Sequence, residues 1–526
     1  MSRRQFLKAG AALAASALPL AGKLGAATPA APAAPLKRLG TAEPFDYAQL
    51  KGLARSMSAA VYKPPSVVLP PPIAKLSWDQ WQAIRFRDNH SLWAGEGVWY
   101  QARFFHLGFT VTKPVRLYSV ESGHAQELAY DAAMFDYSRS GVDAHKLAPN
   151  LGFAGFRLLF HSDWTRDVAA FQGASYFRAV DGDKQYGMSQ RGLAIDCGMG
   201  RPEEFPDFIA YYLERPARNS SQVTVYGLLD SASVAGAYRF VIDVADTIVM
   251  DIDAALYPRK SIERLGIAPG TSMFLDGPND RRVDNDWRPA IHDSDGLQIN
   301  NGSAEWLWRP LVNPSRLLVT SFSAHELKGF GLMQRDRNFL SYEDTEARYD
   351  QRPSVWITPK GSWGPGRVEL VQIPTPDETN DNIVAYWVPD HQPAPGEALD
   401  YAYRMHWQGD KQQHPPSGWA VQSRRGHGFT PAGIARDPSE VQYVIDFDGP
   451  SLRALAHNAK VNPMVTAGVN AIITDQNAFY NDVTGAWRMT LRVNRLQPLQ
   501  PVELRAYLRS GDNALTETWT AIIPPD

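Results

Sequence analysis

The sequence predicts a mostly β protein in which large antiparallel sheets pack face to face. From about residue 98 onward, apolar and polar residues alternate with a period of two, as in Val223–Tyr226. Helical spacing is confined to the first part of the chain. The 40 Gly and 39 Pro fall between the strand patterns and mark turns. These three observations favour an all-β fold whose main domain is an antiparallel β-sandwich.

The first residues predict export from the cytoplasm. Ser2-Arg3-Arg4-Gln5-Phe6-Leu7-Lys8 joins an arginine pair to an apolar pair and a lysine, and a short apolar run follows at 9–20. A membrane-spanning helix needs about 20 apolar residues, so the run is too short to be one. The pattern is typical of a twin-arginine signal peptide, here 1–27, which directs folded proteins to the bacterial periplasm. Residues 28–41, rich in Pro and Ala, are expected to be a disordered tether.

The composition limits the kinds of partner that we expect the protein to bind. The net charge of -3 argues against nucleic acid, which requires a basic face. No segment after the signal is apolar enough for stable membrane insertion. Aromatic residues make up 11% of the chain, with 15 Trp, and this surplus at near-neutral charge favours a neutral carbohydrate. The single cysteine, Cys197, lies in an apolar run, where we expect it to be buried and unreactive.

Two helices are predicted before the β-rich part. The first lies within 45–62, where apolar residues recur at helical spacing. The second begins after Ser77, since Ser77-Trp78-Asp79-Gln80 is typical of a helix N-terminus, and runs through Ile84. The Pro-rich stretch 63–72 between them is predicted to be a loop.

Strand patterns then follow one another along a predicted sandwich domain, 42–407. Two of them, 238–244 and 247–252, flank a two-residue turn and therefore predict a hairpin. The other patterns in this domain lie at 103–106, 115–120, 223–226, 367–373 and 383–388.

A polar, Pro-containing stretch interrupts the pattern and predicts a linker at 408–420. About 100 residues with short strand patterns follow, at 441–447, 487–493 and 504–508. Because this segment has no cysteine pair, it predicts a disulfide-free Ig-like domain at 421–526.

Two acidic loops could carry chemistry. One contains His292, Asp293 and Asp295, and the other contains Glu378 and Asp381. Hydrolysis of a glycosidic bond needs one protonated and one ionised carboxyl group. The residues alone leave two alternatives open, namely turn-forming acidic loops without catalytic function and a metal site in the His292 loop. Our expectation is an enzyme that uses no metal or other cofactor.

Several runs of residues resemble the OpgG/OpgD family of periplasmic glucans biosynthesis proteins. The resemblance extends from about residue 45 to the C-terminus and is most specific before the linker. The twin-arginine signal favours the D branch of the family. The runs that carry the resemblance are 152–157, 173–179, 186–196, 203–206, 229–233 and 267–274.

The resemblance implies a galactose mutarotase-like sandwich followed by an Ig-like domain, and a homodimer. It also implies an anomer-inverting endo-β-1,2-glucanase, or a related ring-closing transglycosylase, acting on β-1,2-glucan. Asp381 would be the general acid and Asp293 the general base, supported by Glu378, Asp295 and His292. The resemblance also implies that Tyr349 closes over the substrate. Further candidate substrate-binding residues are Trp356 and three residues of the runs above that could line the cleft, Tyr176, Arg178 and Arg191.

Alternatives remain beside this reading. Tyr176, Arg178 and Arg191 are equally well explained as strand residues that make structural hydrogen bonds. The whole chain could also be a non-catalytic glucan-binding or scaffold protein of the assembly machinery, or a metal-dependent enzyme that uses His292 and Asp293.

Overall fold

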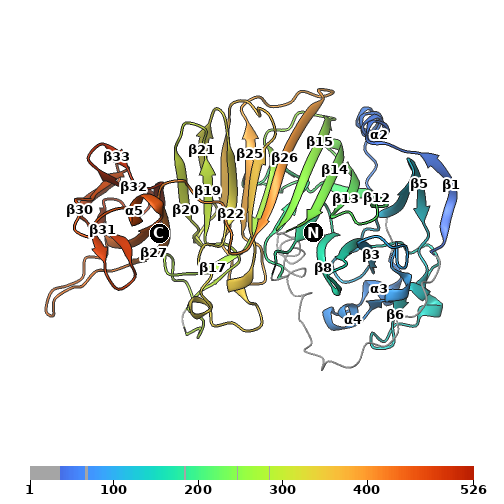
Figure 1. Cartoon of the computed structure of the whole chain (residues 1–526), viewed down its shortest axis with the longest axis horizontal. Coiled ribbons are helices and arrows are strands. Elements are labelled where there is room, and N and C mark those ends of the chain that lie inside the picture. Colours follow the sequence, from blue (N-terminus) through green and yellow to red (C-terminus); the bar gives the residue numbers. More distant parts are fainter. Residues whose placement is uncertain (1–35, 66–68, 183–184, 246, 284, 526) are drawn as a thin grey trace. The chain divides into compact units, whose positions relative to one another are not determined.

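The structure is a computed structural model that describes residues 36–65, 69–182, 185–245, 247–283 and 285–525. The predicted signal peptide and residues 28–35 of the tether lie outside this range. Strands dominate the described chain, which confirms the prediction of an all-β, sandwich-type fold (Figure 1). Within it, no helix is long and apolar enough to cross a membrane.

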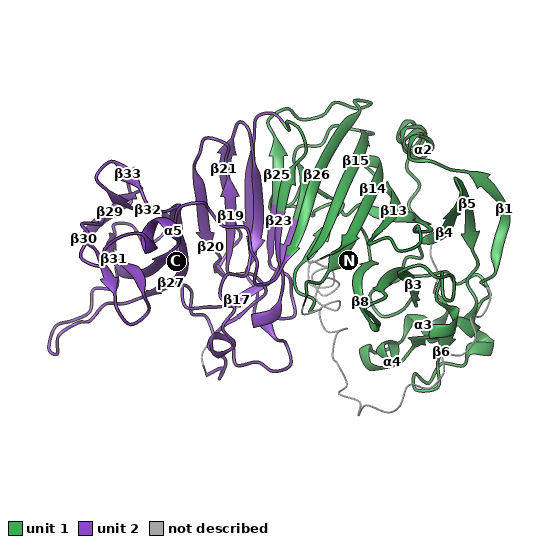
Figure 2. Ribbon diagram, in the orientation of Figure 1, with its two compact units in different colours: residues 1–269, 357–363, 386–407 green, residues 270–356, 364–385, 408–526 purple. Residues whose placement is uncertain are grey.

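The chain forms two compact units (Figure 2). Unit 1 comprises residues 1–269, 357–363 and 386–407, and unit 2 comprises residues 270–356, 364–385 and 408–526. Both predicted acid loops belong to unit 2. The predicted boundaries at 407 and 420 stay a prediction.

Unit 1 contains two layers of strands. The first layer has the order β1 (Arg38–Pro44), β5 (His124–Leu128), β4 (Arg116–Glu121), β12 (Asp207–Glu214), β13 (Gln222–Asp230), β14 (Val234–Val244), β15 (Ile248–Pro258) and β26 (Leu399–Gln408). The second has the order β16 (Leu265–Ser272), β10 (Ser189–Arg191), β9 (Tyr176–Ala179), β8 (Asp163–Gln172), β7 (Gly155–Phe160) and β3 (Tyr100–Phe105), with β11 (Leu193–Ile195) beside β16.

Aromatic side chains fill the space between these two layers. Phe171 of β8 meets Phe240 of β14 with ring centroids 5.3 Å apart, and Phe156 of β7 meets Tyr211 of β12 at 5.1 Å. These edge-on contacts bury large apolar surfaces. The predicted hairpin is confirmed, since β14 and β15 pair in register from Val234↔Pro258 to Val244↔Ile248.

The predicted helices are confirmed, with shorter bounds. Helix α2 (Tyr47–Ala59) begins at a capping box in which Asp46 and Gln49 bond each other's backbone N–H. Helix α4 (Trp78–Gln82) has the same arrangement, made by Ser77 and Gln80. In each case the side chains satisfy N–H groups that a helix start leaves unpaired.

Three local features differ from or complete the predictions. Residues 38–41 of the predicted tether are part of β1, because this segment pairs with β5 and Arg38 forms an ion pair with Glu121 at 2.6 Å. The predicted loop 63–72 ends in helix α3 (Pro71–Ala74), since proline is tolerated in the first turn of a helix. Cys197 is 1% exposed, which confirms that it is buried, and burial raises the pKa of its thiol to about 12, in agreement with the low reactivity expected of it.

The short elements complete unit 1 and part of unit 2. They are β2 (Arg85–Phe86), β6 (Phe135–Asp136) and the 3-10 helices at Asp88–His90, Ala132–Met134, Ala144–Lys146, Phe339–Ser341 and Tyr349–Gln351.

Unit 2 carries the strands that position the acid loops. One sheet has the order β23 (Ser354–Pro359), β22 (Gly329–Met333), β19 (Gly296–Asn300), β20 (Trp306–Pro310), β34 (Thr518–Ile523), β32 (Val502–Ser510) and β29 (Asn462–Ala467), with β33 (Asn513–Ala514) beside β32. A second set is β21 (Leu318–Ala324), β24 (Gly366–Gln372) and the first residues of β25 (Ile383–Pro389). Residues 357–359 of β23 and 386–389 of β25 belong to unit 1. The pair β17 (Phe274–Asp276) and β18 (Ile291–His292) stands apart.

Residues 408–526, called here the C-terminal region, also contain helix α5 (Pro450–Arg453) and a four-stranded antiparallel sheet. That sheet has the order β27 (Trp419–Gly426), β28 (Glu440–Asp448), β31 (Ala486–Arg495) and β30 (Ala471–Asn481). The region is joined to the rest of unit 2 by main-chain pairing, because β34 lies parallel to β20 with Trp308 opposite Trp519.

Candidate functional site

Strand β17 and the residue before it hold the two predicted acid loops together. The N–H of Asp293 donates to the carbonyl of Met273 at 2.8 Å. Asn382, the neighbour of Asp381, accepts from the N–H of Phe274 at 2.8 Å and donates to its carbonyl at 3.0 Å. Because both loops bind adjacent residues of one strand start, Asp293 and Asp381 are held in one neighbourhood of unit 2.

Arg352 is the cation that pairs with Asp293 and interacts electrostatically with Asp381. Its guanidinium donates a short hydrogen bond to Asp293, and both side chains are buried. Burial lowers the pKa of Arg352, but the charges of Asp293 and Asp381, together with Tyr349, hold it above its ordinary value. The guanidinium therefore compensates a carboxylate that would otherwise be costly to bury. Sequence reasoning missed Arg352, because no local pattern marks it as a partner of Asp293.

Asp381 is less enclosed than Asp293. Its residue is partly buried, and its Oδ2 atom is shielded from solvent, whereas Asp293 is 2% exposed. A general acid and a general base must differ in pKa, and carboxyl groups in different surroundings can do so.

Glu378 ties the Asp381 loop to Tyr349. The Tyr349 hydroxyl donates to Glu378 Oε2 at 3.0 Å, and Arg288 Nη1 donates to the same oxygen at 2.6 Å. The same guanidinium pairs with Asp344 at 3.1 Å. Burial raises the pKa of Tyr349, so its hydroxyl stays protonated and acts as a donor. Trp287, next to Arg288, is 67% exposed, an aromatic surface beside this network that the sequence analysis did not single out.

His292 is a buried structural group in this arrangement. Its Nδ1 lies 2.9 Å from Gln334 Oε1, and its ring stacks on Phe274 with centroids 5.2 Å apart. Burial lowers the pKa of His292 to about 4, so the ring is neutral at physiological pH. Across the described ranges, His, Cys, Asp and Glu side chains form no group of three suited to holding a metal ion.

Asp295 anchors the chain that follows β22. Its Oδ2 accepts the N–H groups of Arg335 and Asp336, each at 3.0 Å. Its Oδ1 is buried and has no hydrogen-bond partner among the described residues. Burial raises the pKa of Asp295 from 3.8 to about 7, despite the two N–H donors. Asp295 therefore supports the site as an anchor that titrates near neutrality.

Asp295→Asn is expected to raise the melting temperature by a few degrees above pH 7 and to change it little at pH 4. Burial raises the pKa of Asp295 in the folded state. The contribution of the protonated carboxyl group to the free energy of unfolding is therefore fully present below about pH 4 and is lost as the pH rises through about 7. Asn stays neutral throughout, and its carbonyl can accept the same N–H groups. Calorimetry across this range tests the expectation, and parallel curves for the two proteins would contradict it.

The remaining predicted binding residues belong to other strands. Trp356 is 4% exposed and stacks on Trp306 at 5.5 Å in the core of unit 2, a packing position. Tyr176 and Arg191 pair across β9 and β10 in unit 1, where Arg191 binds Glu203 at 2.6 Å. Arg178 is 5% exposed in β9. Substrate contacts for these four residues stay predictions, and the bonds of Arg191 agree with the structural alternative.

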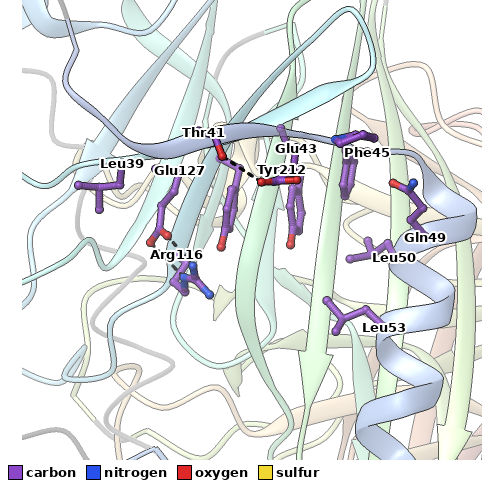
Figure 3. A pocket seen from close by; sticks show the side chains of 14 residues that line it. Leu39, Thr41, Glu43, Phe45, Gln49, Leu50, Leu53, Arg116, Glu127 and Tyr212 are labelled. Atoms are coloured by element: carbon purple, nitrogen blue, oxygen red, sulfur yellow. Dashed lines mark hydrogen bonds and ion pairs between the residues drawn. The ribbon is translucent and has the colours of Figure 1, made fainter.

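Unit 1 also contains an open pocket of about 510 Å³, lined by residues of β1, α2 and the sheet beside them (Figure 3). Phe45 and Tyr212 stack within it with centroids 4.2 Å apart, and Tyr118 continues the stack at 4.4 Å. Arg116 and Glu127 form a two-point ion pair at its wall. An aromatic surface beside fixed charges suits an uncharged, hydroxyl-rich ligand.

Known proteins resemble this chain over nearly its full length. Glucans biosynthesis protein D of Stenotrophomonas maltophilia is 49% identical over 528 residues, 99% of this chain and 97% of the relative. Glucans biosynthesis protein D of Xanthomonas campestris pv. campestris is 51% identical over 524 residues, with the same coverage. A solved structure, the α-N-acetylgalactosaminidase NagBb of Bifidobacterium bifidum in complex with GalNAc, covers 47% of this chain and 36% of its own at 12% identity. Its TM-score of 0.24 is too low to bear on the fold.

Two family models match. The twin-arginine translocation signal model matches residues 1–19, which confirms the predicted export to the periplasm. The model described as periplasmic glucan biosynthesis protein, MdoG, matches residues 45–523. With relatives about half identical across the whole chain, the protein belongs to the MdoG family of periplasmic glucan biosynthesis proteins.

Proposed function

We propose that this protein is an anomer-inverting glycoside hydrolase, or a related inverting transglycosylase, that acts on the β-1,2-glucan backbone in the periplasm. The observation that carries the proposal is the pair Asp293 and Asp381. Asp293 and Asn382, the neighbour of Asp381, bind the adjacent residues Met273 and Phe274, and both carboxylates interact electrostatically with Arg352. Membership in a glucan biosynthesis family supports the substrate class.

In the proposed reaction, Asp381 gives its proton to the oxygen of the glycosidic bond as that bond breaks. Asp293 takes a proton, directly or through intervening water, from the nucleophile that attacks the anomeric carbon from the opposite face. Attack by water gives hydrolysis, and attack by a sugar hydroxyl gives a new linkage. Either outcome inverts a β linkage to α. Arg352 holds Asp293 in place throughout.

Incubation with linear β-1,2-glucan tests this proposal. A rise in reducing ends indicates hydrolysis. A product one water lighter than the linear chain, seen by mass spectrometry, indicates ring closure. If wild-type protein gives neither product, the enzymatic proposal is wrong.

The second candidate function is a non-catalytic glucan-binding or scaffold protein. The observation that favours it is the unit 1 pocket, where the rings of Phe45, Tyr212 and Tyr118 lie beside the Arg116–Glu127 ion pair, since an apolar lining with a few polar groups is typical of small-ligand sites. Calorimetric binding of β-1,2-glucan without turnover would support this function in place of the first.

Tyr349→Ala is expected to lower kcat by roughly tenfold or more, with a smaller change in KM. The ring packs over Arg352 at 4.4 Å and the hydroxyl binds Glu378, so its loss frees two groups of the site. Tyr349→Phe keeps the ring and removes one hydrogen bond of about 1 kcal/mol, so its effect on kcat should be roughly fivefold. Steady-state kinetics of both variants tests this, and equal rates in all three proteins would contradict it.

A homodimer, with clefts completed by the segment around Tyr349, is a further part of the proposal. Light scattering at working concentration tests it, and a monomer with full activity would exclude it.

A further inference from the structure

We propose that residues 334–337, called here the coupling segment, make the C-terminal region a positioning element of the candidate active site. The proposal rests on the proposed function for its kinetic test. It assigns the C-terminal region a role in holding the acid loop and Arg352, beyond any separate binding role.

Gln334 is the first point of connection. Its side-chain amide lies 2.9 Å from His292 Nδ1 and donates to the carbonyls of His292 at 2.9 Å and Tyr349 at 3.1 Å. Its own carbonyl accepts a hydrogen bond from Gln412 of the C-terminal region at 2.5 Å. Gln334 has no exposed surface. A single buried residue therefore bonds the residue before Asp293 on one side and the C-terminal region on the other.

Arg335 is the strongest connection. Its guanidinium forms a two-point ion pair with Glu517, at 2.6 and 3.0 Å, and donates to the carbonyl of Ala420 at 2.9 Å. It also lies over the ring of Trp308 at 3.6 Å. The side chains of Arg335 and Glu517 are 2% and 0% exposed. A buried pair of this kind contributes geometric specificity more than net stability, because desolvation offsets much of the attraction.

Asp336 and Arg337, the last two residues of the coupling segment, also bind the C-terminal region. Asp336 accepts from Gln422 Nε2 at 3.0 Å, and Arg337 pairs with Asp410 at 2.8 Å. Arg337 also donates to the carbonyl of Arg352 at 2.8 Å. The C-terminal region thus reaches the backbone of the residue that binds Asp293.

Each residue of the coupling segment therefore contacts the C-terminal region, and Gln334 and Arg337 also contact the site. Asp295 fixes the segment's backbone through the N–H groups of Arg335 and Asp336. Catalysis is sensitive to misplacement, since a shift of about 1 Å can cost about 100-fold in rate. A shift of the segment would move the His292 carbonyl and the Arg352 backbone, and with them Asp293.

The chain offers a matched control. Arg309 of β20 forms an ion pair with Glu503 of β32 at 2.6 Å, which also joins the C-terminal region to the rest of unit 2. Arg309 donates to Thr520, and among the described residues this pair forms no hydrogen bond or ion pair with residues 334–337. The Glu503 side chain is 47% exposed and that of Glu517 is 0% exposed, so Glu517→Gln is expected to cost more stability. The kinetics are therefore compared at a temperature where both variants are fully folded, and there the proposal predicts an effect on kcat from Glu517 alone.

The test compares Glu517→Gln with Glu503→Gln in the full chain. Glu517→Gln should lower kcat by roughly tenfold to 100-fold, with a smaller change in KM, while Glu503→Gln should leave both within about twofold. If Glu517→Gln does not fold, the double variant Arg335→Met/Glu517→Leu, which leaves no unpaired charge, takes its place. Unchanged kinetics in a folded Glu517 variant, or an equal loss in Glu503→Gln, would overturn the proposal.

Hydrogen exchange separates this proposal from the proposed function. Glu517→Gln should increase amide exchange at 291–296 and 349–352, and Glu503→Gln should not. This result is expected even if the wild-type protein turns over no glucan. Unchanged protection of both segments in Glu517→Gln would overturn the coupling whatever the activity.

Discussion

Asp381→Asn is expected to abolish measurable turnover of β-1,2-glucan and to leave folding and glucan binding nearly intact. An amide keeps the shape of the carboxyl group but cannot supply a proton to the departing sugar oxygen. Loss of a general acid costs about 100- to 10,000-fold in rate. The loop itself should stay in place, because the neighbouring Asn382 and not Asp381 makes the bonds to Phe274. Reducing-end assays and calorimetric binding measure the two quantities.

Asp377→Asn is the matched control for this substitution. Asp377 lies in the same loop, is exposed, and accepts the N–H of Thr379 at 2.9 Å, a bond that an Asn carbonyl can also accept. We expect near wild-type rates for this variant. Wild-type activity in Asp381→Asn, or an equal loss in Asp377→Asn, would remove Asp381 as the acid.

Local patterns carried most of the fold prediction. Alternation identifies β14 and β15 because their apolar faces repeat every second residue, and capping side chains identify the starts of α2 and α4. Strand β1 has no such signal. Its sequence, Arg-Leu-Gly-Thr-Ala-Glu-Pro, is exposed along its length, and it is a strand because it pairs with β5, 80 to 90 residues later in the chain.

The candidate site was predictable only in part. Two acidic loops are visible in the sequence, but the bond between Phe274 and Asn382 joins residues 108 positions apart. Arg352 likewise becomes the partner of Asp293 only through the fold, at a separation of 59 positions. Contacts at such separations leave no local periodicity, so spacing could not reveal them.

Aromatic content was a weak guide to sugar binding. The surplus of Trp favoured sugar binding, yet Trp387, Trp407 and Trp519 are among the largest fully buried side chains. Trp356 is also buried, whereas Trp287, which no pattern singled out, is exposed beside Arg288. Composition gives the number of aromatic rings but not which of them are buried, since Trp occurs both in cores and on binding surfaces.

Asp293→Asn is expected to reduce turnover by about 100- to 10,000-fold, the range for a general base. It should also destabilise the fold, because removing one partner of a buried ion pair leaves the Arg352 charge uncompensated, at a cost of about 3–5 kcal/mol. A lower rate alone therefore cannot separate a base from a structural partner. Denaturant unfolding beside the kinetics measures both effects.

The double variant Asp293→Asn/Arg352→Gln separates the two roles. Removing both charges should recover much of the lost stability, since no buried charge is left unpaired, while turnover stays at the level of the single variant. Recovery of activity together with stability would show that Asp293 serves only as the partner of Arg352. The wild-type product gives the stricter test of mechanism, because attack opposite the leaving group must yield an α anomer first, and NMR of fresh product that shows β would refute inversion.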